Sequence, residues 1–327
     1  MPKRKIMIIV PIAFGYTQYI YKALLKHQNI ETTLVFIENK NYSYRNFFHR
    51  LSNFLHKTFL KVNLKKRQIL DRIRPFGQQD KIFIIRPDLL DDYVLKSIKK
   101  NTKVFTAFYF DSIGHIPRKK YIISFFDRIL SFDKVDVKKY GFEFCTNYIF
   151  DQSESIKNHD FLFFNISSHD DDYRFYKLVE MAKYIKAHDW SFNFISIDIK
   201  NKNIKNDLLT IQKDIIPVQS IKKQLLKSKI LVEFQRENQI GLSFRVFEAL
   251  GYRKKLITTN TDVVNYDFYN PQNIFIIDRN NIKIDKAIFE VKYKDIDSNT
   301  YEKMSIDGWI NAIFFGNESN FWIAGIE

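Results

Sequence analysis

The stretch Gln239–Asn260 reads QIGLSFRVFEALGYRKKLITTN, and the rest of the chain is organised around it. It opens with a short polar segment that contains Gly241. Apolar residues then recur at helical spacing: Phe244, Phe247 and Leu250. Gly251 stands where a glycine commonly ends a helix, and residues 255–259 are predicted to form a strand. The stretch therefore predicts a loop, a helix, a turn and a strand in succession.

The start of this predicted helix is suited to binding an anion. The first N–H groups of a helix have no partner within it and carry partial positive charge. Gly241 allows a close backbone approach, Ser243 adds a hydroxyl, and Arg245 offers a bidentate fork to the same phosphate. Glu248 lies three residues on and shares a face with Arg245, where a carboxylate suits a pair of ribose hydroxyls. The alternative is an amphipathic helix with an internal ion pair.

The pattern Gly-Leu-Ser-x-Arg-x-x-Glu-Ala-Leu-Gly, followed by Lys-Lys-Leu-Ile-Thr-Thr-Asn, resembles the donor-site segment of GT-B glycosyltransferases. It is especially similar to that of bacterial capsule, exopolysaccharide and lipopolysaccharide transferases. The resemblance implies an α/β fold of two Rossmann-like parallel-sheet domains that face a central cleft. It implies that Glu248 binds ribose, that Arg245 lies near phosphate, and that the diphosphate meets one loop: Gln239, Gly241, Leu242 and Ser243. Retaining enzymes usually have a second glutamate seven residues earlier, where this chain has Gly241, so the resemblance implies no stereochemical course.

The same resemblance implies further donor contacts in the second half of the chain. The loop before the helix predicted over 220–226 often binds the nucleobase, which makes Val218 and Gln219 candidates. Arg174 follows the first strand of that half and is available to phosphate, although Asn165, Ser167 and Ser168 replace the usual loop glycine. The acidic run at 169–172 is predicted to face solvent, and no metal site is expected.

Composition sets the bounds of these expectations. A chain of 327 residues accommodates two domains, predicted as an acceptor domain over 1–150 and a nucleotide-sugar domain over 151–327. The single cysteine, Cys145, excludes an internal disulfide and fits a cytoplasmic protein. Residues 1–150 have a net charge of +16 and residues 151–327 a net charge of −1. The basic half is therefore expected to meet an anionic surface: a membrane, a nucleic acid or a phosphorylated substrate.

Residues 41–74 combine aromatic and basic side chains. The apolar members recur at helical spacing: Phe47, Phe48, Leu51, Phe54, Leu55 and Phe59. The basic members lie between and after them: Arg50, Lys57, Lys61, Lys65, Lys66 and Arg67. A basic helix with an aromatic face can lie in a membrane interface. The alternative is an ordinary helix whose apolar stripe packs on the sheet of the first domain.

The first half also contains candidates for catalysis and acceptor binding. A strand predicted over 104–110 ends at Asp111, and His115 follows; α/β domains place chemistry at such strand ends. Either side chain is a candidate general base for an acceptor hydroxyl, while Asp111 is also a candidate helix cap. The start of the chain is predicted to be a first strand rather than a signal peptide. The loop after that strand makes Phe14, Gly15 and Tyr16 candidates on the acceptor side.

These observations predict a glycosyltransferase that moves a sugar from a nucleoside diphosphate sugar to a bacterial surface polysaccharide or lipopolysaccharide acceptor. The acceptor is expected to be lipid-linked, and the enzyme peripheral at the inner face of the cytoplasmic membrane, with no metal or other cofactor. One alternative is a non-catalytic nucleotide-binding partner of a glycan synthase. A basic nucleic-acid-binding protein is disfavoured because no RNA-binding signature occurs and the phosphate-binding helix lies in the neutral half.

Overall fold

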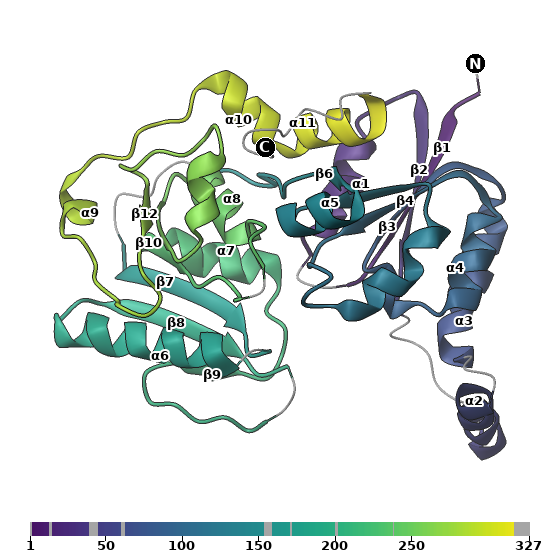
Figure 1. Cartoon of the computed structure of the whole chain (residues 1–327), viewed down its shortest axis with the longest axis horizontal. Helices are drawn as coiled ribbons and strands as arrows, with labels where there is room; N and C mark the ends of the chain where they lie inside the picture. The colour runs from purple at the N-terminus through teal and green to yellow at the C-terminus, as the bar shows by residue number, and fades with distance from the viewer. Residues whose placement is uncertain are drawn as a thin grey trace. The chain divides into compact units, whose positions relative to one another are not determined.

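The computed structural model describes residues 2–12, 15–38, 45–59, 63–153, 159–170, 172–199, 202–237 and 239–316. Phe14, Lys61 and part of the 41–74 segment lie outside these residues, and only the backbone is described at Lys65 and Lys66. The chain divides into two compact units. The N-terminal unit comprises Met1–Ala13 and Thr17–Cys145; the C-terminal unit comprises Phe14–Tyr16 and Thr146–Glu327. Each unit is built around one twisted sheet with helices against it (Figure 1).

The sheet of the N-terminal unit has six described strands in the order β2-β1-β3-β4-β5-β6, and all neighbours are parallel. The strands are β1 (Arg4–Val10), β2 (Ile30–Phe36), β3 (Gln79–Ile85), β4 (Thr102–Tyr109), β5 (Arg128–Ser131) and β6 (Glu143–Phe144). β1 is an almost unbroken apolar run, as expected for a parallel strand covered on both faces. The carboxyl ends of the strands meet at one edge, where Asp111 follows β4.

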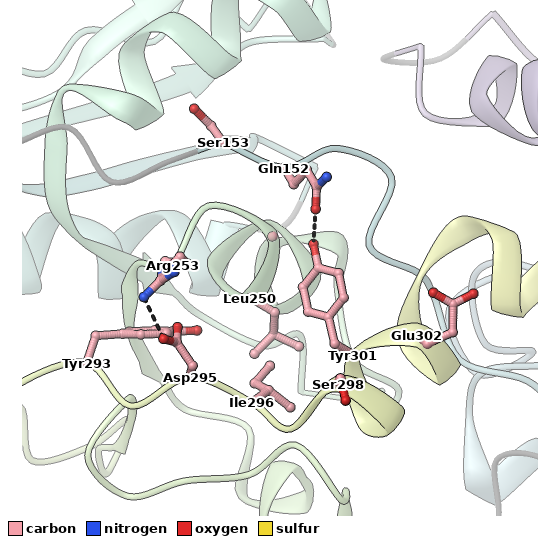
Figure 2. A pocket seen from close by; sticks show the side chains of 11 residues that line it. Gln152, Ser153, Leu250, Arg253, Tyr293, Asp295, Ile296, Ser298, Tyr301 and Glu302 are labelled. Atoms are coloured by element: carbon pink, nitrogen blue, oxygen red, sulfur yellow. Dashed lines mark hydrogen bonds and ion pairs between the residues drawn. The ribbon is translucent and has the colours of Figure 1, made fainter.

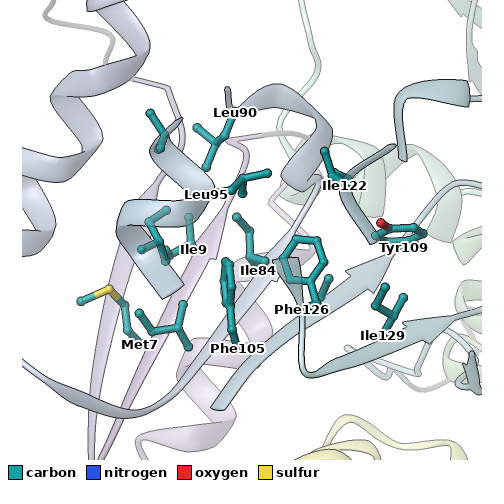
Figure 3. Close-up of a cluster of buried hydrophobic side chains, with 14 of the residues drawn as sticks. Met7, Ile9, Ile84, Leu90, Leu95, Phe105, Tyr109, Ile122, Phe126 and Ile129 are labelled. Atoms are coloured by element: carbon teal, nitrogen blue, oxygen red, sulfur yellow. The ribbon is translucent and has the colours of Figure 1, made fainter. Parts of the chain in front are cut away.

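Four described helices pack against the sheet of the N-terminal unit: α1 (Thr17–Leu24), α3 (Leu64–Ile73), α4 (Asp92–Lys99) and α5 (Lys134–Tyr140). A further helix of this unit is α2 (Phe47–Phe59). Figure 3 shows how the core interdigitates: Ile84 and Phe105 from the sheet meet Leu95 from α4. α5 begins at Asp133, whose carboxylate accepts a hydrogen bond from the Val135 N–H, and ends at Gly141 with φ at +68°. This cap and this left-handed glycine follow directly from the local sequence.

α2 departs from this arrangement because its apolar side chains do not pack on the sheet. Phe47, Phe48 and Phe59 are each more than 70% exposed, at 73%, 76% and 77%. Asn53 is its only buried residue, and the Asn53 side-chain oxygen accepts a hydrogen bond from the Leu64 N–H at 2.7 Å. α2 therefore turns a polar side chain toward the protein and its aromatic face outward, contrary to the alternative of an apolar stripe packed on the sheet.

The C-terminal unit is a second parallel sheet of six described strands, in the order β12-β11-β10-β7-β8-β9. Its strands are β7 (Phe161–Ser168), β8 (Phe192–Ile197), β9 (Thr210–Gln212), β10 (Ser228–Glu233), β11 (Lys255–Thr258) and β12 (Ile274–Ile276). Its helices are α6 (Asp172–Ala187), α7 (Val218–Leu226), α8 (Phe244–Gly251), α9 (Ala287–Glu290), α10 (Ser298–Met304) and α11 (Ile306–Ile310). The predicted loop, helix, turn and strand at 239–260 are present as α8 and β11 with their flanking segments.

The structure shows that Gly251 has a different role from the predicted one. Gly251 is the last residue of α8 rather than a left-handed residue beyond it. A Cβ atom at Gly251 would lie 2.3 Å from the carbonyl oxygen of Asp151. Glycine is needed here because the segment at 151–153 passes directly against the helix. The predicted fold class, α/β with two Rossmann-like parallel sheets, is confirmed.

Candidate functional site

The loop before α8 is held in place by side-chain amides that bind its carbonyl oxygens. Gln235 Nε2 donates to the carbonyls of Gln239 and Gly241, each at 2.8 Å. Asn260 Nδ2 donates to Ile240 O at 2.9 Å, and Asn147 Nδ2 donates to Leu242 O at 2.8 Å. Gln235, Asn147 and Asn260 are all buried. The backbone that leads into the helix is therefore fixed before a ligand arrives, which lowers the ordering cost of binding.

Ser243 caps α8, and its hydroxyl makes two hydrogen bonds within the protein. It accepts a hydrogen bond from the Arg245 N–H at 3.3 Å and hydrogen-bonds the buried carboxyl of Glu233 at the end of β10. The sequence predicted Ser243 as a phosphate ligand through its loop. The structure shows that its hydroxyl first serves as the helix cap, so an anion would meet the backbone of this turn.

Arg245 and Glu248 form a buried ion pair within α8. Arg245 Nη1 lies 2.5 Å from Glu248 Oε2, and the two residues are 8% and 2% exposed. Arg245 Nη2 also donates to Ile166 O at 3.1 Å. Burial raises the pKa of the Glu248 carboxyl, while the Arg245 charge and the Tyr16 hydroxyl lower it. The internal ion pair that the sequence offered as an alternative is thus present.

Tyr16 lies directly against this pair, within the C-terminal unit. Its hydroxyl donates to Glu248 Oε1 at 3.0 Å, and its ring stacks on Phe244 at a centroid distance of 4.6 Å. Gly15, with φ at +81°, precedes it, and a Cβ atom there would lie 3.3 Å from Val218 Cγ1. Tyr16 and Gly15, predicted for the acceptor, therefore contact Glu248 and Val218, predicted for the donor. Gln219 is exposed on the first turn of α7.

Three arginines gather near the carboxyl ends of β7 and β10. Asp170 lies between two of them: Arg174 Nη2 donates to Asp170 Oδ1 at 2.5 Å, and Arg236 Nη2 donates to Asp170 Oδ2. Arg174 and Arg245 are both close enough to Glu233 to affect it electrostatically. Burial raises the pKa of Glu233, and hydroxyl hydrogen bonds and these arginines oppose that rise. The guanidinium groups of these three arginines are of the kind that binds phosphate and diphosphate groups.

Glu233 and Arg236 were not identified from the sequence. Glu233 is buried at the end of a strand, where Thr258 Oγ1 donates to its carboxylate. A signal was present, because an acid interrupts the apolar run of β10 at the carboxyl edge of the sheet. Such an edge is where ligands bind in parallel α/β domains.

The predicted general bases belong to the N-terminal unit. Asp111 is 8% exposed, and its Oδ2 lies 3.5 Å from Arg86 Nη1. Lys119 is fully buried and its Nζ donates to the Asp111 carbonyl at 2.5 Å. Burial lowers the pKa of Lys119 to about 8, although Asp111 and Asp88 oppose this. His115 is exposed, and its backbone N–H donates to Ser112 Oγ at 3.2 Å. Asp111 is thus part of a buried ionic network and His115 is on the surface.

Two further predictions concern metals and membranes. Within the described ranges, no group of three or more histidine, cysteine or acidic side chains is placed to hold a metal ion. In the run at 169–172, His169 Nε2 lies 2.7 Å from Asp172 Oδ1, Asp172 also binds Lys202, and Asp171 lies outside the described residues. Among the helices that the structure describes, none has the length and apolar character needed to span a bilayer.

Comparison with known proteins identifies the fold but no family. No protein-family model matches the chain, and no curated protein sequence matches it. Among solved structures, the complex of S. aureus MnaA with UDP aligns with a TM-score of 0.52 and 12% identity over 95% of this chain and 94% of that one. The UDP-N-acetylglucosamine 2-epimerase from Rickettsia bellii aligns with a TM-score of 0.48 and 10% identity over 95% and 99%. The glycotransferase of kitacinnamycin aligns with a TM-score of 0.42 and 10% identity over 95% and 96%.

The alignment with S. aureus MnaA extends over nearly the whole of both chains, so both sheets take part in the likeness. The chain has the GT-B type of fold, with two Rossmann-like units in sequence. At these levels of identity the likeness defines architecture, and activity has to be argued from the residues of this chain.

Proposed function

We propose that the protein is a glycosyltransferase that uses a nucleoside diphosphate sugar and no metal or other cofactor. The observation that carries the proposal is the C-terminal cluster of Arg174, Arg236 and Arg245 beside the N-terminus of α8. Guanidinium groups and helix amides can stabilise the charge that develops on a departing diphosphate without a metal ion. The fixed loop at 239–243 supplies the preorganisation that such stabilisation requires.

The reaction needs a base as well as a leaving-group site. An acceptor hydroxyl attacks the anomeric carbon, the bond to the diphosphate breaks, and the hydroxyl proton passes to a base. Asp111 remains our first candidate for that base. Asp111 follows β4 at the carboxyl edge of the sheet, where parallel α/β domains place their chemistry. His115 is the second candidate because it is exposed and follows in the same turn.

Nucleotide binding tests the donor half of the proposal. UDP, GDP, dTDP and CMP should be compared by thermal shift, and the proposal expects one nucleoside diphosphate to stabilise the protein. Stabilisation grows with the ratio of ligand to dissociation constant. Stabilisation by none of them, together with binding to RNA, would favour a nucleic-acid-binding protein. Nucleotide binding without transfer of a sugar to any acceptor would favour a non-catalytic partner of a glycan synthase.

The base assignment has its own test. Asp111→Asn should lower sugar transfer by about 10²–10⁴-fold, the usual contribution of a general base. Nucleotide affinity should be unchanged, because the arginine cluster belongs to the C-terminal unit. Asp71→Asn, at an exposed position of α3, is the matched control in the same unit. Retention of most activity in Asp111→Asn would exclude this residue and direct attention to His115.

We propose further that the acceptor is a lipid-linked bacterial surface glycan. We also propose that α2 attaches the enzyme to the anionic inner face of the cytoplasmic membrane. Support comes from the exposed aromatic face of α2 and the exposed Arg50 and Lys57 on the same helix. An exposed apolar patch of this kind marks an interaction surface. Phenylalanines beside basic residues fit the boundary between acyl chains and anionic headgroups.

A further inference from the structure

A pocket in the C-terminal unit lies at the other end of α8 from its N-terminal cluster. Its volume is about 780 Å³, within the range of small-molecule sites. Its walls come from three segments that are distant in the sequence: residues 152–153, the end of α8, and residues 293–302 (Figure 2). All of these segments belong to the C-terminal unit. None of the residues assigned above to nucleotide binding lines it.

Specific contacts hold the walls of the pocket in place. The Tyr301 hydroxyl donates to Gln152 Oε1 at 2.9 Å, and this bond closes one side (Figure 2). Asn273, itself buried, binds both backbone groups of Lys294, at 2.6 Å and 2.9 Å. The close approach of Asp151 to Gly251 brings the first wall against the helix. The pocket is therefore a built feature of this unit.

One lining residue carries an unfavourable feature that a packing role does not require. The Tyr293 hydroxyl is buried and has no hydrogen-bond partner among the described residues. Buried hydroxyls normally have a partner, and the lack of one is costly. Such an unsatisfied group marks a position where a ligand can supply the missing partner.

The charges of the lining disfavour a nucleotide or a phosphate. Arg253 Nη2 and Asp295 Oδ2 are 2.6 Å apart, so this pair neutralises itself (Figure 2). Glu302 adds a further negative charge, which leaves the lining with a net charge of −1. An anionic ligand would be repelled here. The nucleotide therefore belongs at the arginine-rich end of α8, and a neutral ligand belongs at this end.

The remaining lining chemistry suits a saccharide. The rings of Tyr293 and Tyr301, with Leu250 and Ile296, offer apolar surface to the C–H faces of sugar rings. Hydroxyl, amide and carboxylate groups offer hydrogen bonds to sugar hydroxyls: Ser153, Ser298, Gln152 and Glu302. The combination of aromatic faces and converging polar groups is the general pattern of a ligand site with specificity.

We propose that this pocket is a second saccharide-binding site, which takes a neutral oligosaccharide independently of the nucleotide. The identity of that oligosaccharide as a segment of the glycan that the enzyme extends rests on the function proposed above. Such a site would keep a growing glycan attached to the C-terminal unit between transfers. Because saccharide binding at this pocket is independent of the nucleotide, this proposal can be tested separately from the proposed transferase activity.

The test uses the full-length protein and neutral sugars as probes. Titration calorimetry with trisaccharides of glucose and of N-acetylglucosamine should give saturable binding by at least one of them. The monosaccharides should bind more weakly, and saturating UDP should leave the trisaccharide affinity unchanged. Ser298→Trp, which places an indole at the pocket, should abolish trisaccharide binding. Glu302→Gln, which keeps the shape, should weaken it about tenfold, as expected for a lost hydrogen bond to a charged group.

Asn299→Ala is the matched control, since Asn299 is exposed on the same helix and does not line the pocket. It should leave trisaccharide binding unchanged, and all three variants should bind UDP and unfold as the wild type does. The proposal is overturned if no trisaccharide binds at millimolar concentration, or if Ser298→Trp binds as well as wild type. It is also overturned if only a monosaccharide binds and UDP-sugar displaces it, since the sugar would then occupy the donor site.

Discussion

Helices α2 and α8 both have an amphipathic sequence with phenylalanines at helical spacing, and yet their surroundings are opposite. All eight residues of α8 are buried, including Arg245 and Glu248. Only one residue of α2 is buried, and it is the polar Asn53. The spacing of apolar residues predicted both helices correctly, but it did not predict what would cover them. The α8 stripe is covered by the protein itself, and we propose that the α2 stripe is covered by a membrane.

The largest effect is expected where α8 buries its charges. Glu248→Ala should destabilise the C-terminal unit by about 3–5 kcal/mol, because it leaves Arg245 buried without its partner. Denaturant unfolding measures the loss, with the exposed Glu237→Ala as control. Wild-type stability in Glu248→Ala would show that the pair is open to water.

A double variant separates stability from binding at the same pair. Replacing Arg245 and Glu248 together by methionine should restore most of the stability, because an apolar pair of similar size is often neutral in such positions. Nucleotide affinity, measured by titration calorimetry, should still be lost, since no guanidinium or carboxylate remains to meet the ligand. Normal nucleotide affinity in this double variant would remove both residues from the donor site.

For α2 the same kind of substitution should affect binding rather than stability. Phe47→Ser, Phe54→Ser and Phe59→Ser combined should lower binding to anionic vesicles by more than about tenfold, because each fully buried phenylalanine contributes about 1.5–3 kcal/mol. Unfolding stability should change little, since all three side chains are exposed. Tyr121→Ser, at an exposed aromatic of the same unit, is the control for co-sedimentation. A large loss of stability would mean that the face is covered by protein.

The basic residues of α2 should contribute less than its phenylalanines. Arg50→Gln and Lys57→Gln should each weaken binding to anionic vesicles by about 1 kcal/mol at low salt. The difference from wild type should shrink as salt rises, because the Debye length is about 10 Å at 0.1 M. Co-sedimentation across a salt series measures this. Equal losses on neutral vesicles would show that charge is not the cause.

A small effect of the opposite sign is expected at Tyr16. Its hydroxyl occupies Glu248 Oε1, one of the two oxygens that a ribose diol would need. Tyr16→Phe removes that competing bond, worth about 0.5–1.5 kcal/mol, and keeps the ring on Phe244. Nucleotide affinity should therefore rise a few-fold in calorimetric titrations. A fall in affinity would indicate that the hydroxyl contacts the nucleotide directly.

The sequence predicted the two parallel sheets well because buried parallel strands leave unbroken apolar runs, as in β1. It also predicted the start of α8, because the Ser243 cap is a local interaction. It could not predict that Tyr16 would bond Glu248, since that contact joins residues 232 positions apart. From the sequence, Gly251 was predicted to have a local role as the end of a helix. In the structure glycine is required there because the backbone of Asp151, distant in the sequence, passes against it. Local pattern thus predicted the elements, and the partners of each site residue needed the folded chain.

The hydrogen bond between Asn53 and the backbone of Leu64 has a practical consequence for work with the purified protein. This bond joins the inner side of α2 to the chain and leaves its phenylalanine face uncovered when no lipid is present. Two such faces on separate molecules can pack against each other and bury their phenylalanine side chains. The purified protein should therefore self-associate reversibly as its concentration rises, and a mild detergent below the denaturing range should return it to the monomer in gel filtration.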